Sequence, residues 1–167
     1  MKNIVFGLLI IFFALLSCRT GDEDVRRIDQ ILNIYMKNKA GRDVLHSRKD
    51  NTYFTYSLND VNGVSDIAPV NSTLRATADS TLFIEYIAGA KRVGLDTLNP
   101  DDKIYHSVIT VSLIKRLNNT ILDTINDKLE IQYRMTPQVF EVSKVLYNDT
   151  LRFTKQAGAP NVVTIIK

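Results

Sequence analysis

The sequence predicts an all-β fold, an antiparallel β-sandwich (immunoglobulin-like) or a partly open barrel, preceded by a signal peptide and a short tether. Three observations support this prediction. Segments rich in β-branched and aromatic residues recur roughly every 8 to 14 residues. Turn-forming residues separate these segments, and no convincing helix lies between them.

The N-terminal segment has the features of a secretory leader. Lys2 supplies a short positive region, and a near-continuous apolar run follows from Ile4 to Leu16. This run is shorter than the roughly 20 apolar residues that a membrane-spanning helix needs, and polar residues follow it at once. We therefore interpret residues 1–17 as a signal peptide.

The segment Leu15-Leu16-Ser17-Cys18 resembles the bacterial lipobox, in which a small residue precedes a cysteine that is lipidated before cleavage. The resemblance implies that Cys18 carries acyl chains such as palmitate and becomes the first mature residue. Cys18 is the only cysteine of the chain, so it can form no internal disulfide. An ordinary thiol beside an ordinary cleavage site is the alternative. Two or three acyl chains anchor a protein durably, because each buried methylene contributes about 0.8 kcal/mol.

The residues after Cys18 are polar and suit a tether. We assign residues 18–30 to the lipidated cysteine and tether, and residues 31–167 to a single β-sandwich domain. The acidic run Asp22-Glu23-Asp24 also resembles the signal that sends Bacteroidota lipoproteins to the outer face of the outer membrane. The resemblance implies a lipid-anchored outer-membrane protein, with the cell surface favoured and the periplasmic face left open.

The first strands are predicted from alternation and from turn residues. Leu32, Ile34 and Met36 alternate with more polar residues, which is the period of a half-buried strand. A helix from Val25 to Lys37 is the main alternative. A second strand is predicted at Tyr53–Leu58, before turn residues 59–63.

The later part of the chain repeats this pattern of strands and turns. Residues 65–79 are polar and form a long predicted connection, in which residues 72–76 could add a short strand. Gly94 to Asp102 is predicted to be a loop. Val162–Ile166 alternates little, so we expect it to be buried on both faces or to lie between the sheets. The strands predicted after residue 80 are Thr81–Ile87, Ile104–Lys115, Ile121–Ile125, Leu129–Tyr133, Val139–Tyr147, Leu151–Phe153 and Val162–Ile166.

Several segments of the mature chain look like those of small uncharacterised Bacteroidota lipoproteins. That group has a Gly-x-Asp-Leu-Leu-like element early in the chain and a Lys-Val-Tyr-Tyr-Asn-like element before the last strand. Val44 and Leu146 depart from these two patterns. The resemblance implies a β-sandwich at a cell envelope and no known activity. The segments concerned are residues 38–45, 109–113, 123–125, 144–148 and 163–167.

The residues available for catalysis are few, so we expect neither an enzyme nor a metal or cofactor site. The chain has two histidines, His46 and His106, and no tryptophan. His46 has only Asp43 and Asp50 nearby, a spacing that a solvated loop explains better than a zinc site. Nucleophile-elbow, phosphate-loop and zinc-helix signatures are missing from the sequence. Acidic pairs could serve acid–base or calcium-binding roles, but turn chemistry is the favoured explanation for Asp60, Asp66, Asp101 and Asp102.

The charge balance argues against nucleic acid as a partner. Formal net charge is +3, and loss of Lys2 with the leader leaves 20 basic and 18 acidic residues, or +2. The basic residues are scattered, without the interleaved aromatic residues on which bases would stack. Aromatic side chains could instead form a sugar-binding face, although strand aromatics more often belong to the core. The candidates are Tyr53, Phe54, Tyr56, Tyr86, Tyr105, Tyr133 and Tyr147.

Four short motifs resemble the acceptor of Bacteroidota O-glycosylation, an aspartate followed by serine or threonine and then an aliphatic residue or threonine. Turns that lead into strands also favour these pairs, which is the alternative explanation. The candidate acceptors are Ser80, Thr97, Thr124 and Thr150.

Together these features predict a lipid-anchored, non-catalytic binding, adhesion or accessory module. Its expected partners are the membrane, through lipid on Cys18, and an envelope protein or a glycan. A small envelope hydrolase or carbohydrate-active enzyme that uses acidic residues, or an immunity or inhibitor lipoprotein, remains the alternative.

Overall fold

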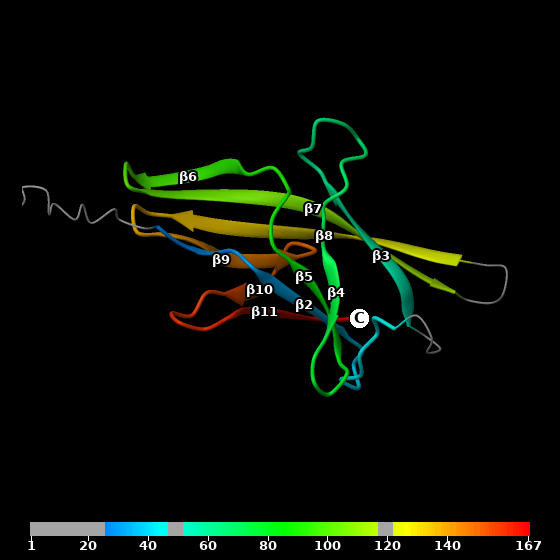
Figure 1. The fold of residues 1–167 in the computed structure, drawn as a ribbon. Coiled ribbons are helices and arrows are strands. Elements are labelled where there is room, and N and C mark those ends of the chain that lie inside the picture. The colour runs from blue at the N-terminus through cyan, green and yellow to red at the C-terminus, as the bar shows by residue number, and fades with distance from the viewer. Residues whose placement is uncertain (1–25, 47–51, 117–121) are drawn as a thin grey trace, which may run out of the picture.

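The computed structural model describes residues 26–46, 52–116 and 122–167, and these residues form eleven strands and no helix (Figure 1). The strands belong to two sheets, which confirms the predicted all-β, sandwich-like fold. Within the described ranges, no helix is long and apolar enough to cross a membrane.

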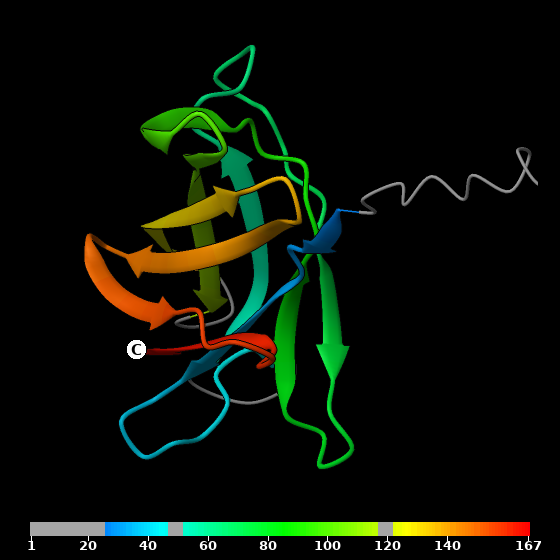
Figure 2. The ribbon, with the colours of Figure 1, turned by 90° about the vertical axis from the view of Figure 1, so that its left-hand side faces the viewer.

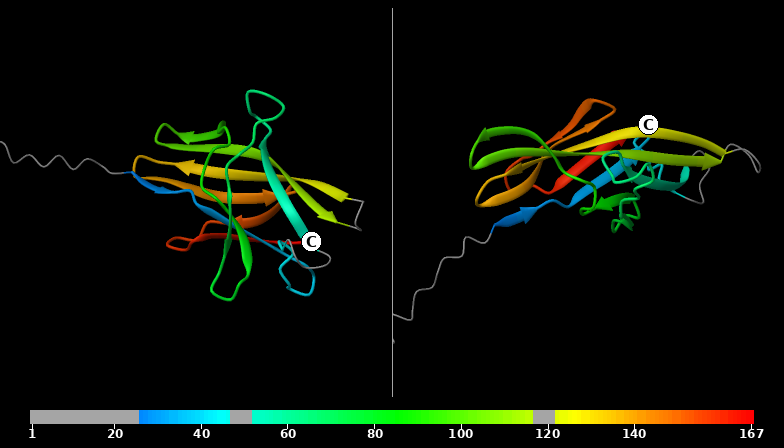
Figure 3. Two further views of the ribbon diagram at one scale, coloured as in Figure 1. Left: turned by 45° about the vertical axis from the view of Figure 1, so that its right-hand side comes forward. Right: turned by 90° about the horizontal axis from the view of Figure 1, so that it is seen from above.

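The larger sheet has the order β1-β9-β8-β7-β3, with β10 also paired to β9 and β6 also paired to β7. Its β7–β8 hairpin runs the length of the molecule (Figure 3). Strands β6 and β3 pair with different halves of β7. The strands of this sheet are β1 (Arg27–Asp29), β3 (Tyr53–Asp60), β6 (Val93–Asn99), β7 (Asp102–Arg116), β8 (Leu122–Met135), β9 (Val139–Tyr147) and β10 (Thr150–Thr154).

The smaller sheet has the order β11-β2-β5-β4. Figure 2 shows how the larger sheet curves, so that β10 comes next to β11 at one side of the molecule. The strands of the smaller sheet are β2 (Leu32–Lys37), β4 (Thr73–Ala76), β5 (Leu82–Tyr86) and β11 (Asn161–Ile166).

The core follows from strand alternation, because every second side chain of a strand points to the same face. On β2 the buried positions are Leu32, Ile34 and Met36, as the sequence predicts. Full burial of each such side chain stabilises the fold by about 1.5–3 kcal/mol. The centre of the long hairpin adds Ile109, Val111 and Leu113 from β7 and Leu129, Ile131 and Tyr133 from β8.

Strand β2 confirms the prediction for residues 32–37 and contradicts the helix alternative over its described part, residues 26–37. Strand β1 lies inside the segment predicted to be tether, and it pairs with β9. This pairing is parallel, and so is that of β11 with β2, so the sheets are mixed instead of purely antiparallel.

Three other predictions were wrong. The loop expected from Gly94 to Asp102 is largely strand β6, an edge strand whose residues are all exposed and therefore show no alternation. The two strands predicted at 121–125 and 129–133 form one continuous strand, β8. β11 is buried on one face only, because Val162 and Ile166 are exposed while Val163 and Ile165 are buried.

Candidate binding cavity

Strand β1 forms one wall of a cavity at the end of the sandwich where the described chain begins. The backbone amide of Arg27 donates a 2.9 Å hydrogen bond to the carbonyl of Gln138. Nε of Arg26 donates a 3.3 Å hydrogen bond to the carbonyl of Pro137. These contacts hold β1 against the turn between β8 and β9, with Arg27 opposite Val139 in parallel register.

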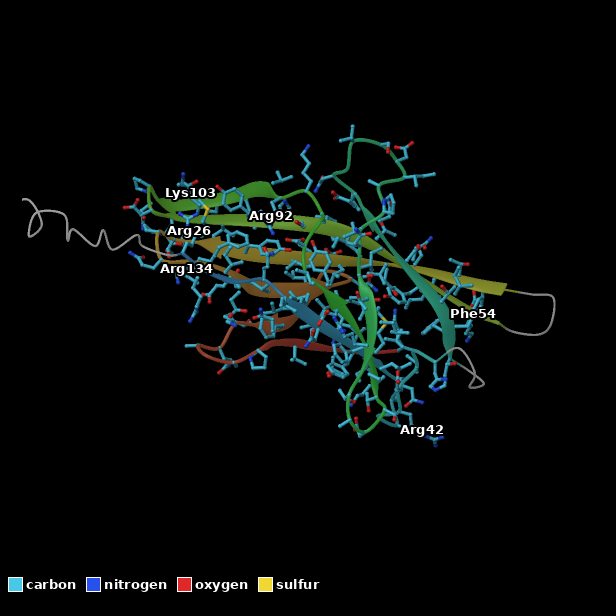
Figure 4. All side chains as sticks on the ribbon, viewed as in Figure 1. Arg26, Arg42, Phe54, Arg92, Lys103 and Arg134 are labelled. Carbon is cyan, nitrogen blue, oxygen red and sulfur yellow. The ribbon has the colours of Figure 1, made fainter. Side chains whose placement is uncertain are left out.

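The cavity has a volume of about 370 Å³, which lies within the range of roughly 300–1,000 Å³ typical of small-molecule sites. Its walls come from β1, β7, β8 and β9 and from the segments just outside β1 and β6. Figure 4 labels two of its residues, Arg26 and Arg92. The lining residues are Arg26, Ile28, Gln30, Arg92, Tyr105, Met135 and Phe140.

The guanidinium of Arg92 lies over two aromatic rings. Its central carbon is 4.6 Å from the ring centroid of Phe140 and 5.0 Å from that of Tyr133. The two rings stack on each other with centroids 5.4 Å apart. Nη2 of Arg92 also donates a 2.7 Å hydrogen bond to Oε1 of Gln30. These contacts fix the guanidinium in place without neutralising its charge.

The other arginines at this end of the molecule are paired with acids. Arg134 forms a 2.6 Å ion pair with Asp102, and Arg27 lies 3.4 Å from Glu141. The hydrogen bond from Arg134 is the main reason that the pKa of Asp102 lies below its ordinary value. No carboxylate of the described residues forms an ion pair with Arg26 or Arg92, so both guanidinium groups bring uncompensated positive charge to the cavity.

A second hollow, of about 670 Å³, lies on the opposite face of β7 and β8, because its residues alternate with those of the cavity along these strands. It is open, and it mixes acidic and basic side chains. Its lining residues are Leu95, Asp96, Leu98, Ile104, Gln132, Arg134, Ser143 and Lys144. This mixture favours no single class of ligand.

The residues singled out from the sequence do not come together in one site. Cys18 lies outside the described residues. The four candidate glycosylation sites lie in separate elements, and all are exposed: Ser80 in the β4–β5 turn, Thr97 in β6, Thr124 in β8 and Thr150 in β10. Exposure leaves each hydroxyl open to modification, and the modification itself stays a prediction.

Several acidic side chains and His106 serve structural contacts. Oδ2 of Asp60 accepts a 2.6 Å hydrogen bond from the amide of Lys91, and Oδ2 of Asp43 accepts one of 2.8 Å from the amide of Leu82. Nδ1 of His106 lies 3.3 Å from Oε1 of Glu130. Within the described ranges, no group of three or more His, Cys, Asp or Glu side chains is placed to hold a metal ion.

The tyrosines support the core interpretation. Three are buried, Tyr86, Tyr133 and Tyr147, and three more pack partly buried against the core: Tyr53, Tyr56 and Tyr105. Tyr105 also lines the cavity. Their burial favours the core interpretation over an exposed aromatic face for sugar binding.

Sequence reasoning missed the cavity because its two arginines are distant in the chain. Arg26 reaches the site only through the pairing of β1 with β9, and Pro137, which accepts its hydrogen bond, is 111 residues away. No motif marks either arginine.

A scan against protein-family models found no match, and neither did searches of curated proteins and of solved structures.

Proposed function

We propose that this protein is a lipid-anchored binding module of the cell envelope, with Cys18 as its lipidated residue and the end cavity as its ligand site. The observation that carries the binding role is the cavity itself, where two arginines without an acidic partner border an apolar wall. The use of Asp60, Asp102 and His106 in structural contacts favours binding over catalysis.

Anchoring is supported by the leader and the lipobox-like segment, and the resemblance to Bacteroidota lipoproteins agrees with it. The acidic run at residues 22–24 favours the outer membrane and the cell surface. Cys18 and Arg26 are separated by 26 − 18 = 8 residues, so the chain between them spans at most about 28 Å. Lipidation would therefore keep the cavity close to the membrane surface.

The anchoring part is tested by Cys18→Ala in the native host. We expect the wild-type chain to incorporate labelled palmitate, to show an acyl increment in its intact mass and to stay in the membrane fraction, and we expect Cys18→Ala to lose all three. Ser17→Ala is the matched control, because it keeps a small residue before the cysteine and should still be processed. A wild-type chain without acyl mass would refute the anchor.

A further inference from the structure

We propose that the end cavity binds a small amphipathic carboxylate, whose charged group lies against Arg92 and Arg26 and whose apolar body lies along Ile28, Met135 and Phe140. This inference deepens the proposed function, on which it rests, by naming the class of ligand. Three features of the cavity support it: its charge, its apolar wall and its position in the chain.

The positive charge of the cavity is carried by two planar guanidinium groups. Arg92 is held by two rings on one side and by Gln30 at one nitrogen, so its remaining N–H groups are available in a fixed orientation. Arg26 uses only Nε, toward the carbonyl of Pro137. A guanidinium donates two parallel hydrogen bonds to a carboxylate, and a fixed guanidinium does so with little loss of side-chain freedom.

The apolar wall is incompletely covered. Ile28 is 65% exposed at the edge of the cavity, although isoleucine is among the residues most often buried. Met135 and Tyr105 are partly buried beside it, and Phe140 forms the base under Arg92. An apolar group placed here would cover Ile28 and remove this surface from water.

The composition of the lining favours a carboxylate with an apolar body over a sugar. Apart from the two arginines, only Gln30 and Tyr105 bring polar side-chain groups to the cavity, and Gln30 is already bonded to Arg92. A sugar needs several hydrogen-bonding groups to replace its water. The position near the proposed lipid anchor agrees with an amphipathic ligand, because such molecules concentrate at membrane surfaces.

The test uses the full acylated chain in phosphatidylcholine nanodiscs, with 3-phenylpropionate as the probe. 3-Phenylpropanol is the matched neutral probe, and empty nanodiscs are the blank. Titration calorimetry gives the affinity, and saturation-transfer NMR reports which part of the probe contacts the protein. We expect the acid to bind about tenfold or more tightly than the alcohol, because only the acid forms charge-assisted hydrogen bonds.

Variants assign the binding to this cavity. We expect Arg92→Gln to weaken binding of the acid about tenfold or more, and Arg26→Gln to weaken it by roughly three- to tenfold. Arg92→Lys keeps the charge but loses the planar fork, so its affinity should lie between those of the wild type and Arg92→Gln. Arg42→Gln is the control, because Arg42 is exposed and lies away from the cavity (Figure 4).

Arg92 packs on core rings, so a circular dichroism melt must accompany its variants. If Arg92→Gln does not fold, the exposed Arg26 decides the matter. The inference is overturned if acid and alcohol bind equally or if neither binds above the blank. It is also overturned if Arg26→Gln, together with any Arg92 variant that folds, binds the acid like the wild type. An acylated chain that fails these tests leaves the anchor intact and removes only the ligand class.

Discussion

Two buried tyrosines on neighbouring strands place their hydroxyl groups in different surroundings. The hydroxyl of Tyr147 on β9 donates a 2.9 Å hydrogen bond to Oδ2 of Asp127. The hydroxyl oxygen of Tyr133 on β8 is buried near the hydroxyl groups of Tyr86 and Ser107, but it forms no hydrogen bond of normal geometry with a described residue. Burying a polar group without a partner opposes folding, so these two hydroxyl groups have opposite effects on stability.

This difference predicts opposite results for the same chemical change. Tyr147→Phe removes a donor from a buried carboxylate and should lower the free energy of unfolding by about 1–2 kcal/mol. Tyr133→Phe removes a buried hydroxyl that forms no hydrogen bond of normal geometry, and it should leave that free energy unchanged or raise it by up to about 1 kcal/mol. Urea unfolding followed by circular dichroism measures both. Equal losses in the two variants would contradict the assignment.

At the scale of strands, alternation between core and solvent explains why β2 was predicted and β6 was missed. Strand β2 could be predicted because Leu32, Ile34 and Met36 alternate with partly exposed residues. Strand β6 could not, because all its residues are exposed and its pairing with β7 shifts register twice. β1 is three residues long, and its stability comes from distant contacts that leave no local pattern.

The residues of the cavity could not be predicted from the sequence either. The sequence motifs concern modification, at Cys18 and at four hydroxyl groups, and the strands do not gather these residues. The cavity arises where β1 meets β9 and where Arg92 crosses the rings of Tyr133 and Phe140. Both are long-range contacts, and a single arginine in a sequence carries no sign of the rings that it will contact.

The position of β1 depends on a buried lysine. Nζ of Lys155 donates hydrogen bonds to Oδ2 of Asp29 at 2.6 Å, to the carbonyl of Ala159 at 2.7 Å and to Oδ1 of Asn161 at 2.8 Å. Each of the three N–H donors of the ammonium group thus has an acceptor. These bonds join the end of β1 to the loop before β11 and to the first residue of β11.

Lys155→Met should therefore loosen β1 before the rest of the sheet. We expect the free energy of unfolding to fall by about 1–3 kcal/mol, less than for a fully buried pair because the side chain of Asp29 is 32% exposed. Hydrogen exchange at the Arg27 amide should become faster. Lys144→Met is the control, because Lys144 is exposed and forms no ion pair with a described residue. Unchanged exchange at Arg27 would show that Lys155 does not hold β1.

Over the whole molecule, two carboxylates connect distant parts of the chain through ionic contacts. Asp29 joins β1 to Lys155, and Asp127 in the long hairpin accepts hydrogen bonds from Tyr147, Asn148 and the terminal Lys167. Burial acts to raise the pKa of Asp127, but the hydrogen bonds from Asn148, Lys167 and Tyr147 and the charge of Lys167 outweigh it. The pKa of this carboxyl is therefore below its ordinary value of 3.8.

The pKa of Asp29 is lowered in the same way. Burial acts to raise it, and the hydrogen bond and charge of Lys155, together with the hydrogen bond from Asn161, outweigh that effect. A carboxyl with a lower pKa in the folded chain than in the unfolded chain binds fewer protons when folded. Stability therefore rises with pH through the interval between the two values. The contribution of such a carboxyl to stability is fully present above its ordinary pKa and is lost as pH falls through the pKa of the folded state.

This linkage predicts acid sensitivity that a single substitution reduces. The free energy of unfolding of the wild type should fall between about pH 5 and pH 2, and Asp127→Asn should be less stable than the wild type at pH 6 but lose less on acidification. The two curves should converge at low pH, because a protonated Asp127 is as neutral as asparagine.

Asp66→Asn is the control, because the Asp66 carboxylate is exposed and forms no hydrogen bond with a described residue. Its free energy of unfolding should depend on pH as that of the wild type does. Urea unfolding at each pH measures these curves, and parallel curves for the wild type and Asp127→Asn would mean that Asp127 is not the group whose protonation weakens the fold.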